Sequence, residues 1–171
     1  MPTLQLTSKL TLAIILCGGL FTLAHANTLQ GKVVAIADGN TITILYRTNR
    51  QHRVRLAGID APERDQNFGS KSREHLAELL SGKQVTIQYS KLDHYGRIIG
   101  KVLVDGHDIC LEQIKAGLAW HDKDYAGQQS AEDRQAYAKA EEEARAAKRG
   151  LWADKSPTPP WEFRATNSGH E

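Results

Sequence analysis

Three short clusters of polar residues are candidates for chemistry. They are Asp38-Gly39-Asn40-Thr41, the stretch 55–63, and the stretch 93–97. Taken singly, the first and third have a simple explanation as turns, because Asp, Gly and Asn tolerate the backbone angles of tight turns. The second is harder to explain in this way. Asp60 and Glu63 follow closely after Arg55, which concentrates charge without an evident structural need.

Together, the clusters contain the groups that phosphodiester hydrolysis requires. That reaction needs a metal ion for charge on a phosphate oxygen, guanidinium groups for further negative charge, and a base for water. Arg55 and Arg97 offer rigid forks that match phosphate. Glu63 is a carboxylate available for water activation. Hard oxygen ligands suit Ca²⁺, and the candidates are Asp60 with Asp38 or Asn40.

The motifs within these clusters are specific when they occur together. They are Arg-x-x-Gly-Ile-Asp-Ala-Pro-Glu at 55–63, Tyr-Gly-Arg at 95–97 and Gly-Leu-Trp at 150–152. In this order and spacing they resemble the staphylococcal thermonuclease (micrococcal nuclease) family, and the likeness covers roughly residues 28–153. The resemblance implies an OB-type barrel and a secreted bacterial nuclease. It also implies action on DNA and RNA with little sequence preference and 3′-phosphate products.

The resemblance assigns catalytic and substrate-binding roles. Arg55 and Arg97 would grip the scissile phosphate, and Glu63 would act as general base on the attacking water. Tyr95 would lie near the phosphate or the base. Trp120 is our second candidate for contact with the substrate.

The implied calcium ligands include one departure from the family pattern. Asp60 and the Ala61 carbonyl would bind Ca²⁺ together with the first cluster, which in the family usually reads Asp-Gly-Asp-Thr. Here the second acidic position is Asn40. An amide oxygen can coordinate calcium, but the loss of one formal charge weakens the attraction for a dication. We therefore predict weaker calcium binding, with a shift of Asp38 as one way to compensate.

The N-terminal segment has the features of a signal peptide. Lys9 precedes an apolar run that ends in the small-x-small pattern Ala24-His25-Ala26. A membrane anchor or a buried helix would be the alternatives, but the run is shorter than the ~20 residues of a membrane span. We predict cleavage after residue 26, export to the periplasm or the medium, and no membrane span in the mature chain.

Composition limits the classes of function. The chain has 171 residues, which suits one domain, and a net charge of +2, of which Lys9 would be lost with the signal peptide. That balance excludes a packaging or coat protein for nucleic acid, so contacts with a polyanion must be local. Cys110 would be the single cysteine left, which excludes an internal disulfide and indicates a buried thiol.

Hydrophobic periodicity predicts five strands. Period-two alternation places Val33 and Ala35 in a first strand, residues 42–46 in a second and 54–56 in a third. The same alternation recurs at 85–89, and 97–104 follows after the turn at 93–96. Three antiparallel strands and a later hairpin are therefore expected.

Three helices and a tail complete the predicted domain. Helical spacing covers 70–80 with Ser70 able to cap, 109–116 before Gly117, and 130–148 with Ser130 as cap. The nuclease-like domain is predicted at 27–155. Residues 156–171 are Pro-rich and predicted to be a flexible tail, although Trp152 and Trp161 could pin its near part.

These elements predict an α+β fold that is mainly β, a five-stranded OB-type Greek-key barrel with three helices. By periodicity alone, a small α+β sheet protein would look similar. We expect a monomer.

Two other functions are compatible with such a barrel. One is a degenerate, non-catalytic OB module that binds nucleic acid, which the Asn40 substitution keeps open. The other is an adaptor in the cell envelope that uses the acidic run at 141–143, although that run is more simply a solvated helix face.

Overall fold

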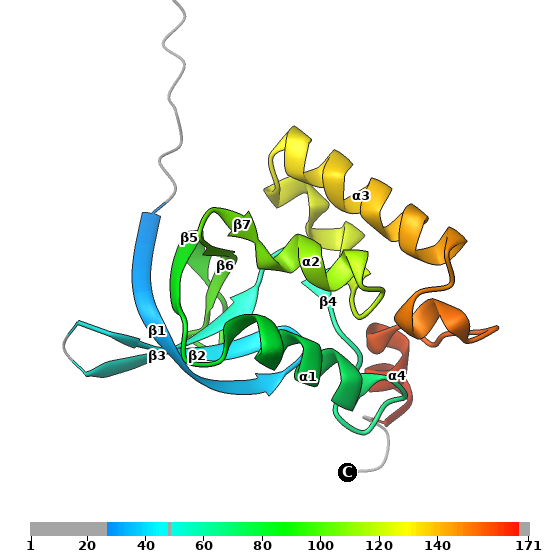
Figure 1. Ribbon diagram of the computed structural model, residues 1–171, viewed down its shortest axis with the longest axis horizontal. Coiled ribbons are helices and arrows are strands. Elements are labelled where there is room, and N and C mark those ends of the chain that lie inside the picture. The colour runs from blue at the N-terminus through cyan, green and yellow to red at the C-terminus, as the bar shows by residue number, and fades with distance from the viewer. Residues whose placement is uncertain (1–26, 48, 168–171) are drawn as a thin grey trace, which may run out of the picture.

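The structure, a computed structural model, describes residues 27–47 and 49–167, so the expected signal peptide lies outside the described residues. Its centre is a closed β-barrel (Figure 1). The barrel strands are β1 (Asn27–Asp38), β2 (Thr41–Tyr46), β3 (Arg50–Leu56), β5 (Gln84–Leu92) and β6 (Ile98–Val104). The predicted class, α+β and mainly β with a five-stranded OB-type barrel, is confirmed.

The strand order explains how the barrel closes. Strands β1, β2 and β3 form an antiparallel meander, and β5 returns to pair with β1, which gives the order β3-β2-β1-β5-β6. A parallel pairing of β3 with β6 joins the two edges, with Val54 opposite Ile98 and Leu56 opposite Gly100. Among the strands that the structure describes, closure leaves no long unpaired barrel edge that could pair with another chain.

Strand β1 pairs with two neighbours and bends between them. Its first half pairs with β5 and its second half with β2, and register shifts interrupt the β1–β2 ladder. One shift lies between Val33 and Ala35. Val33 faces the core as predicted, but Ala35 is exposed because the bulge changes which side chains point inward. Ile36 packs against the core instead.

The three predicted helices are present. They are α1 (Gly69–Leu80), α2 (Ile109–Lys115) and α3 (Ala131–Ala146). Ser130 caps α3 as predicted, since its hydroxyl accepts a hydrogen bond from the Asp133 backbone N at 3.0 Å. The predicted cap of α1 is wrong: the helix begins at Gly69, and Phe68 precedes it in a left-handed conformation without a side-chain cap.

The core fills the barrel and the space under the helices. Cys110 is buried there as predicted, and burial raises the pKa of its thiol, so it is an inert part of the packing. Among the largest fully buried side chains are Ile42, Ile44, Val54, Leu56, Leu76, Leu80, Ile87, Val102, Ile114 and Tyr137.

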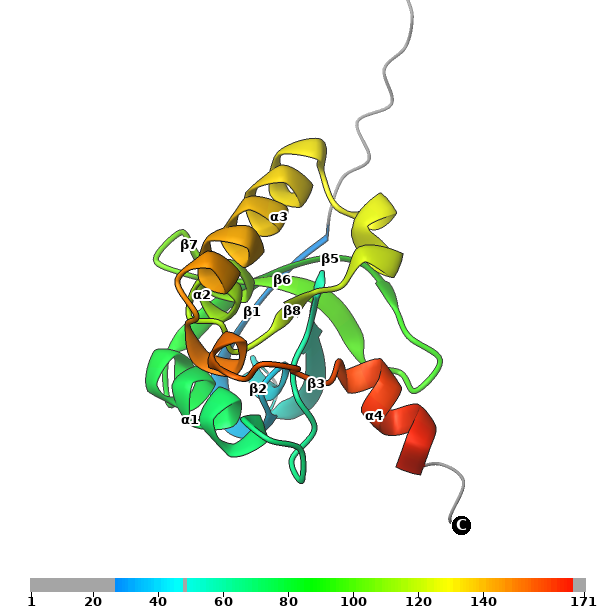
Figure 2. The ribbon, with the colours of Figure 1, turned by 90° about the vertical axis from the view of Figure 1, so that its right-hand side faces the viewer.

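Several short elements were not predicted. They are β4 (Ile59–Asp60), β7 (His107–Asp108), β8 (Trp120–His121), the 3₁₀ turns Lys123–Gln128 and Gly150–Ala153, and the helix α4 (Pro160–Asn167). Helix α4 lies in the segment 156–171 that was predicted to be a flexible tail, and it is an ordered element there. It lies beside the barrel, apart from α3 (Figure 2). Within the described part of the chain, no helix has the length and hydrophobicity that a membrane crossing requires.

Candidate active site

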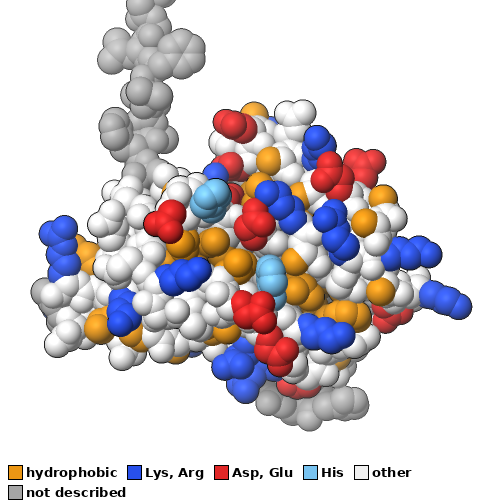
Figure 3. Space-filling view, viewed as in Figure 1, with side chains coloured by type: hydrophobic (Ala, Val, Ile, Leu, Met, Phe, Trp, Pro, Cys, Tyr) orange, Lys and Arg blue, Asp and Glu red, His pale blue; other side chains and the backbone are white. Residues whose placement is uncertain are grey.

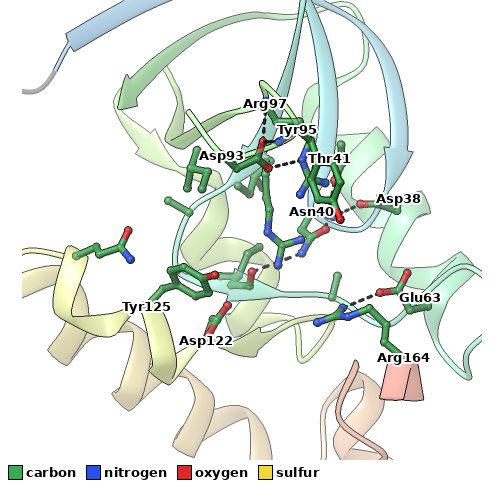
Figure 4. Close-up of a pocket in the computed structure, with 18 of the residues that line it drawn as sticks. Asp38, Asn40, Thr41, Glu63, Asp93, Tyr95, Arg97, Asp122, Tyr125 and Arg164 are labelled. Atoms are coloured by element: carbon green, nitrogen blue, oxygen red, sulfur yellow. Dashed lines mark hydrogen bonds and ion pairs between the residues drawn. The ribbon is translucent and has the colours of Figure 1, made fainter. Parts of the chain in front are cut away.

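The three sequence clusters meet at one cavity of about 450 Å³. The strand register brings them there, because Asp38 pairs with Thr41 and Thr41 pairs with Arg55 at the same end of the sheet. Figure 4 shows Arg97 and Tyr95 on one side of the cavity and Glu63 with Arg164 on another. The polar side chains that line it are Asp38, Asn40, Thr41, Arg55, Glu63, Asp93, His94, Tyr95, Arg97, Asp122, Tyr125, Gln128, Gln129 and Arg164.

The turn between β1 and β2 is fixed against the helices. The Asn40 backbone N donates to Asp38 Oδ1 at 2.9 Å, and the Gly39 carbonyl accepts from Gln113 Nε2 at 2.7 Å. A Cβ at Gly39 would overlap with the Ser72 hydroxyl of α1, so only glycine fits this approach. The predicted turn is therefore also a close contact that holds Asp38 and Asn40 at the cavity.

Asp60 is a buried carboxylate at the site, with 3% of its side chain exposed. Its Oδ1 accepts from Arg55 Nη2 at 2.9 Å and from Asn40 Nδ2 at 3.3 Å. Arg164 Nη2 donates to Oδ2 at 2.7 Å. A buried carboxylate is costly unless it is paired, and here two guanidinium groups and an amide meet that need.

A local ion pair holds Arg97. Its Nε donates to Asp93 Oδ2 at 2.6 Å and its backbone N donates to Asp93 Oδ1 at 2.8 Å. Burial acts to raise the pKa of Asp93, but the hydrogen bonds and charge of Arg97 outweigh it and hold the pKa below the usual value. The guanidinium also lies 5.3 Å from the centre of the Tyr95 ring, and Tyr95 is 73% exposed. The predicted pair of Arg97 and Tyr95 thus stands at the open side of the cavity.

Glu63 is partly exposed and has one charged partner. Its Oε1 accepts from Arg164 Nη1 at 2.7 Å, and its backbone N donates to Gln66 Oε1 at 3.0 Å. The side chain is 37% exposed, so water can reach it. A carboxylate in this setting can take a proton from water once it is free of Arg164.

Arg164 is a site residue that sequence reasoning missed. It comes from α4, in the segment predicted to be a flexible tail. The pKa of Arg164 is raised by its hydrogen bond to Asp60 and further by Glu63, while burial opposes the shift. Pro160 at the first helical position and Glu162 in the first turn are signals that could have indicated this helix.

Asp122 and Tyr125 are two further side chains at the cavity that were not predicted. Burial raises the pKa of Asp122, the negative charge of Asp60 adds to this, and Arg55 opposes it. Tyr125 is 47% exposed, and Lys91 Nζ lies 5.6 Å from its ring centre. Tyr125 therefore offers an open aromatic face at the cavity.

Trp120 lies away from this cavity and is buried. Its ring packs against Trp152 at 4.4 Å and Trp161 at 5.4 Å between centroids, and the Arg145 guanidinium lies 4.8 Å from its centre. Its backbone pairs with that of Asp60 in the short β4–β8 ladder. The structure thus does not bring Trp120 to the predicted substrate site, and its strand supports the Asp60 backbone instead.

Comparison with known proteins identifies the family. Residues 53–154 match the family described as "Staphylococcal nuclease homologue", which covers more than half of the chain. The chain belongs to the staphylococcal nuclease family. The resemblance of the motifs is thus confirmed, and the family match includes the second and third polar clusters.

Relatives with similar sequences carry nuclease names. An "Uncharacterized endonuclease" of Escherichia coli is 38% identical over 137 residues, which is 80% of this chain and 85% of the relative. A similar protein of Haemophilus influenzae with the same description is 40% identical over 133 residues, 78% of this chain and 71% of the relative. A "Micrococcal nuclease" of Shigella flexneri is 41% identical over 145 residues, 79% of this chain and 80% of the relative.

The staphylococcal nuclease family is generally calcium-dependent, so the donor set must be compared with what Ca²⁺ requires. The predicted ligands are all oxygen donors of the kind that calcium accepts, namely the side chains of Asp38, Asn40 and Asp60 and the Ala61 carbonyl. Only two of these are carboxylates. Accordingly, residues 27–47 and 49–167 contain no group of three His, Cys, Asp or Glu side chains arranged to hold a metal.

The donor types therefore fit calcium, but two side-chain contacts stand in the way. Arg164 takes both oxygens of Asp60, with Nη1 at 3.4 Å from Oδ1 in addition to the Nη2 contact at Oδ2. Asn40 turns its Nδ2 toward Asp60 and its Oδ1 toward the Thr41 hydroxyl. A metal that uses these oxygens requires Arg164 to leave and the Asn40 amide to rotate.

Proposed function

We propose that this protein is a calcium-dependent nuclease that hydrolyses phosphodiester bonds of DNA and RNA with little sequence preference and leaves 3′-phosphates. The observation that carries the proposal is the convergence of Arg55, Arg97 and Glu63 beside Asp60 on one open cavity. The family match and the nuclease names of the relatives support the same reaction class.

The two arginines suit the scissile phosphate. Each guanidinium is restrained by a carboxylate, Arg55 by Asp60 and Arg97 by Asp93, so little side-chain entropy is lost when phosphate binds. Both can share hydrogen bonds with the nonbridging oxygens and stabilise the added negative charge of the transition state. Calcium, when bound, would supply further positive charge at one of these oxygens.

Glu63 is the group that would act on water. It accepts a proton from the attacking water as the new bond to phosphorus forms and the bond from phosphorus to the 5′-oxygen breaks. The 5′-oxygen leaves as the 5′-hydroxyl of the downstream fragment after taking up a proton from solvent, and the phosphate stays on the 3′-oxygen of the upstream fragment. These steps account for a 3′-phosphate product without a covalent intermediate.

The open side of the cavity favours contact with any base. Tyr95 and Tyr125 are both exposed there, and aromatic faces stack with every base. The net charge of the chain is only +2, and positive and negative side chains are interspersed on the face that carries α1, α2 and α3 (Figure 3), so the protein does not have the strongly basic charge that tracking a long duplex would require. Little sequence preference and local contact with a few phosphates follow.

A degenerate, non-catalytic nucleic-acid-binding module is the second candidate. The observation in its favour is that Arg55, Asn40 and Arg164 satisfy Asp60 without a metal. In such a protein, Arg55 and Arg97 would bind phosphate without hydrolysis. Export to the periplasm or the medium, based on the N-terminal sequence, and a monomeric state are further parts of our proposal.

Digestion of single-stranded DNA, duplex DNA and RNA by the purified protein tests this proposal. Each substrate is incubated with Ca²⁺, with Mg²⁺ or with a chelator. We expect cleavage that depends on Ca²⁺, and product ends that a polymerase extends only after a phosphatase has removed the 3′-phosphate. Binding of nucleic acid without cleavage under every condition would instead support the non-catalytic candidate.

A further inference from the structure

The C-terminal helix is docked next to the active site through specific contacts. The Trp161 ring packs edge-on against Trp120, and Pro160 is buried. Upstream of the helix, the Thr158 carbonyl accepts from Gln66 Nε2 at 2.6 Å. Three separate contacts therefore fix the segment that carries Arg164. These contacts restrict the Arg164 guanidinium to one position beside the active site.

The guanidinium of Arg164 bridges the two carboxylates that the proposed reaction uses. Nη2 lies 2.7 Å from Asp60 Oδ2, and Nη1 lies 2.7 Å from Glu63 Oε1. Figure 4 shows the contact with Glu63. One cation thus contacts the proposed metal ligand and the proposed base at once. With Arg55 on the other oxygen of Asp60, two positive charges already balance two negative charges.

We propose that Arg164 is a metal-site positioning residue: it holds Asp60 and Glu63 in the metal-free protein and competes with Ca²⁺ for Asp60. The inference rests on the proposed function. An oxygen lone pair that accepts from a guanidinium is not free for a metal, and a second cation beside Arg164 meets charge repulsion. Calcium binding therefore requires the loss of the Arg164 contacts, and the free energy of those contacts makes calcium binding weaker. Release of Arg164 also frees Glu63 to act as a base.

Asn40 is consistent with a site that forms without metal. Its amide donates to Asp60 Oδ1 at 3.3 Å, where a second carboxylate would repel Asp60 until a cation arrived. Asn40 and Arg164 together complete the hydrogen bonds of a buried carboxylate. The site can therefore stay assembled in the absence of calcium, at the expense of calcium affinity.

Calorimetric titration of the purified protein with Ca²⁺ tests the inference, since it measures affinity without any turnover. The variants are Arg164→Gln, Arg164→Lys and Trp161→Ala, and the control is Arg134→Gln on the exposed face of α3. We expect Arg164→Gln to bind Ca²⁺ about tenfold more tightly than the unchanged protein, the effect of losing one charge-assisted contact. Trp161→Ala should change affinity in the same direction, because it loosens the helix without touching Arg164. The calcium affinity of Arg164→Lys should lie between those of Arg164→Gln and the unchanged protein, since the point charge of a lysine cannot bridge both carboxylates.

The direction of the change separates this role from general damage. A variant that merely disturbs the fold loses affinity for calcium, whereas removal of a competitor gains it. Equal affinities in Arg164→Gln and the unchanged protein, or weaker binding by Arg164→Gln, would overturn the inference and leave the proposed nuclease standing. Absence of calcium binding in every variant, together with cleavage that a chelator does not stop, would overturn both the calcium requirement and this inference.

Discussion

Asp60 shows how much of the site depends on single side chains. It is buried, and its partners Arg55, Asn40 and Arg164 lie 5, 20 and 104 positions from it in the chain. Sequence reasoning found Arg55 and Asn40 because they lie in motifs with short spacing. Arg164 is more than a hundred positions from Asp60 in the chain, and no local spacing could relate the two. The predicted ligands and catalytic residues therefore meet as expected, while the group that neutralises them was missed.

Replacement of either phosphate-binding arginine by lysine tests their geometry. Lysine keeps the positive charge but loses the two-pronged contact, so we expect Arg55→Lys and Arg97→Lys each to lower kcat by about 10²-fold. Steady-state cleavage of a labelled oligonucleotide measures the effect. Arg53→Lys, an exposed position on the same strand as Arg55, is the matched control and should keep full activity. Full turnover in Arg97→Lys would contradict the assigned role.

The residue at position 40 should set both calcium affinity and metal-free stability. In Asn40→Asp a second carboxylate lies beside Asp60, so we expect calcium to bind about tenfold more tightly and the metal-free protein to be less stable. Calorimetry measures the first effect and urea unfolding with a chelator measures the second. Asn49→Asp in the β2–β3 turn is the control for the added charge. The idea fails if calcium affinity is the same in Asn40→Asp and the unchanged protein.

At the scale of elements, the longer helices and strands were predicted from their periodic patterns, and the short elements were not. The barrel strands and α1 to α3 were predicted because each has enough residues to show its period. The two-residue strands β4 and β8 have none. Helix α4 has eight residues and would be marginal alone, so it depends on the contact of Trp161 with Trp120. Trp120 was assigned to the substrate for the same reason, since nothing local indicates that its ring packs under a distant helix.

The approach of the β1–β2 turn to α1 gives a test at this scale. A methyl group at Gly39 would overlap with Ser72 and with Ala61 Cβ, so we expect Gly39→Ala to lower the free energy of unfolding by about 1–3 kcal/mol. Urea unfolding is the measurement. Gly127→Ala is the matched control, because no atom lies within 4 Å of its added Cβ and its φ is not positive. Its stability should be unchanged or slightly higher. Equal stability of the two variants would show that the turn does not approach α1 as described.

At the scale of the whole molecule, charge is placed locally and is nearly balanced overall. The chain has 22 basic and 20 acidic side chains among Lys, Arg, Asp and Glu, so attraction to nucleic acid must come from the few arginines at the cavity. This expectation comes from the composition, and the face with α1, α2 and α3 in Figure 3 likewise carries interspersed charges. The closed barrel supplies a rigid support for those few groups.

Local charge predicts a weak dependence of binding on salt. If Arg55 and Arg97 neutralise about two phosphates, the logarithm of the association constant for single-stranded DNA should fall with the logarithm of salt concentration with a slope of about −1.4. Fluorescence anisotropy measures the slope, with the Glu63→Gln variant used because we expect it to cleave slowly. A slope steeper than about −4 would mean that a wide basic surface takes part, against the charge distribution described above.

The most direct test of the central claim is the cleavage rate of Glu63→Gln compared with Glu78→Gln and the unchanged protein. Glu78 is exposed on α1 and serves as the control for loss of a carboxylate. All three are measured under single-turnover conditions with Ca²⁺ and one labelled DNA strand, and binding is measured alongside. We expect Glu63→Gln to bind the strand normally and to cleave it about 10²- to 10⁴-fold more slowly, as for loss of a general base, while Glu78→Gln is unaffected. Cleavage by Glu63→Gln at the unchanged rate would contradict the account, because the cavity would then not be where the phosphodiester bond is broken.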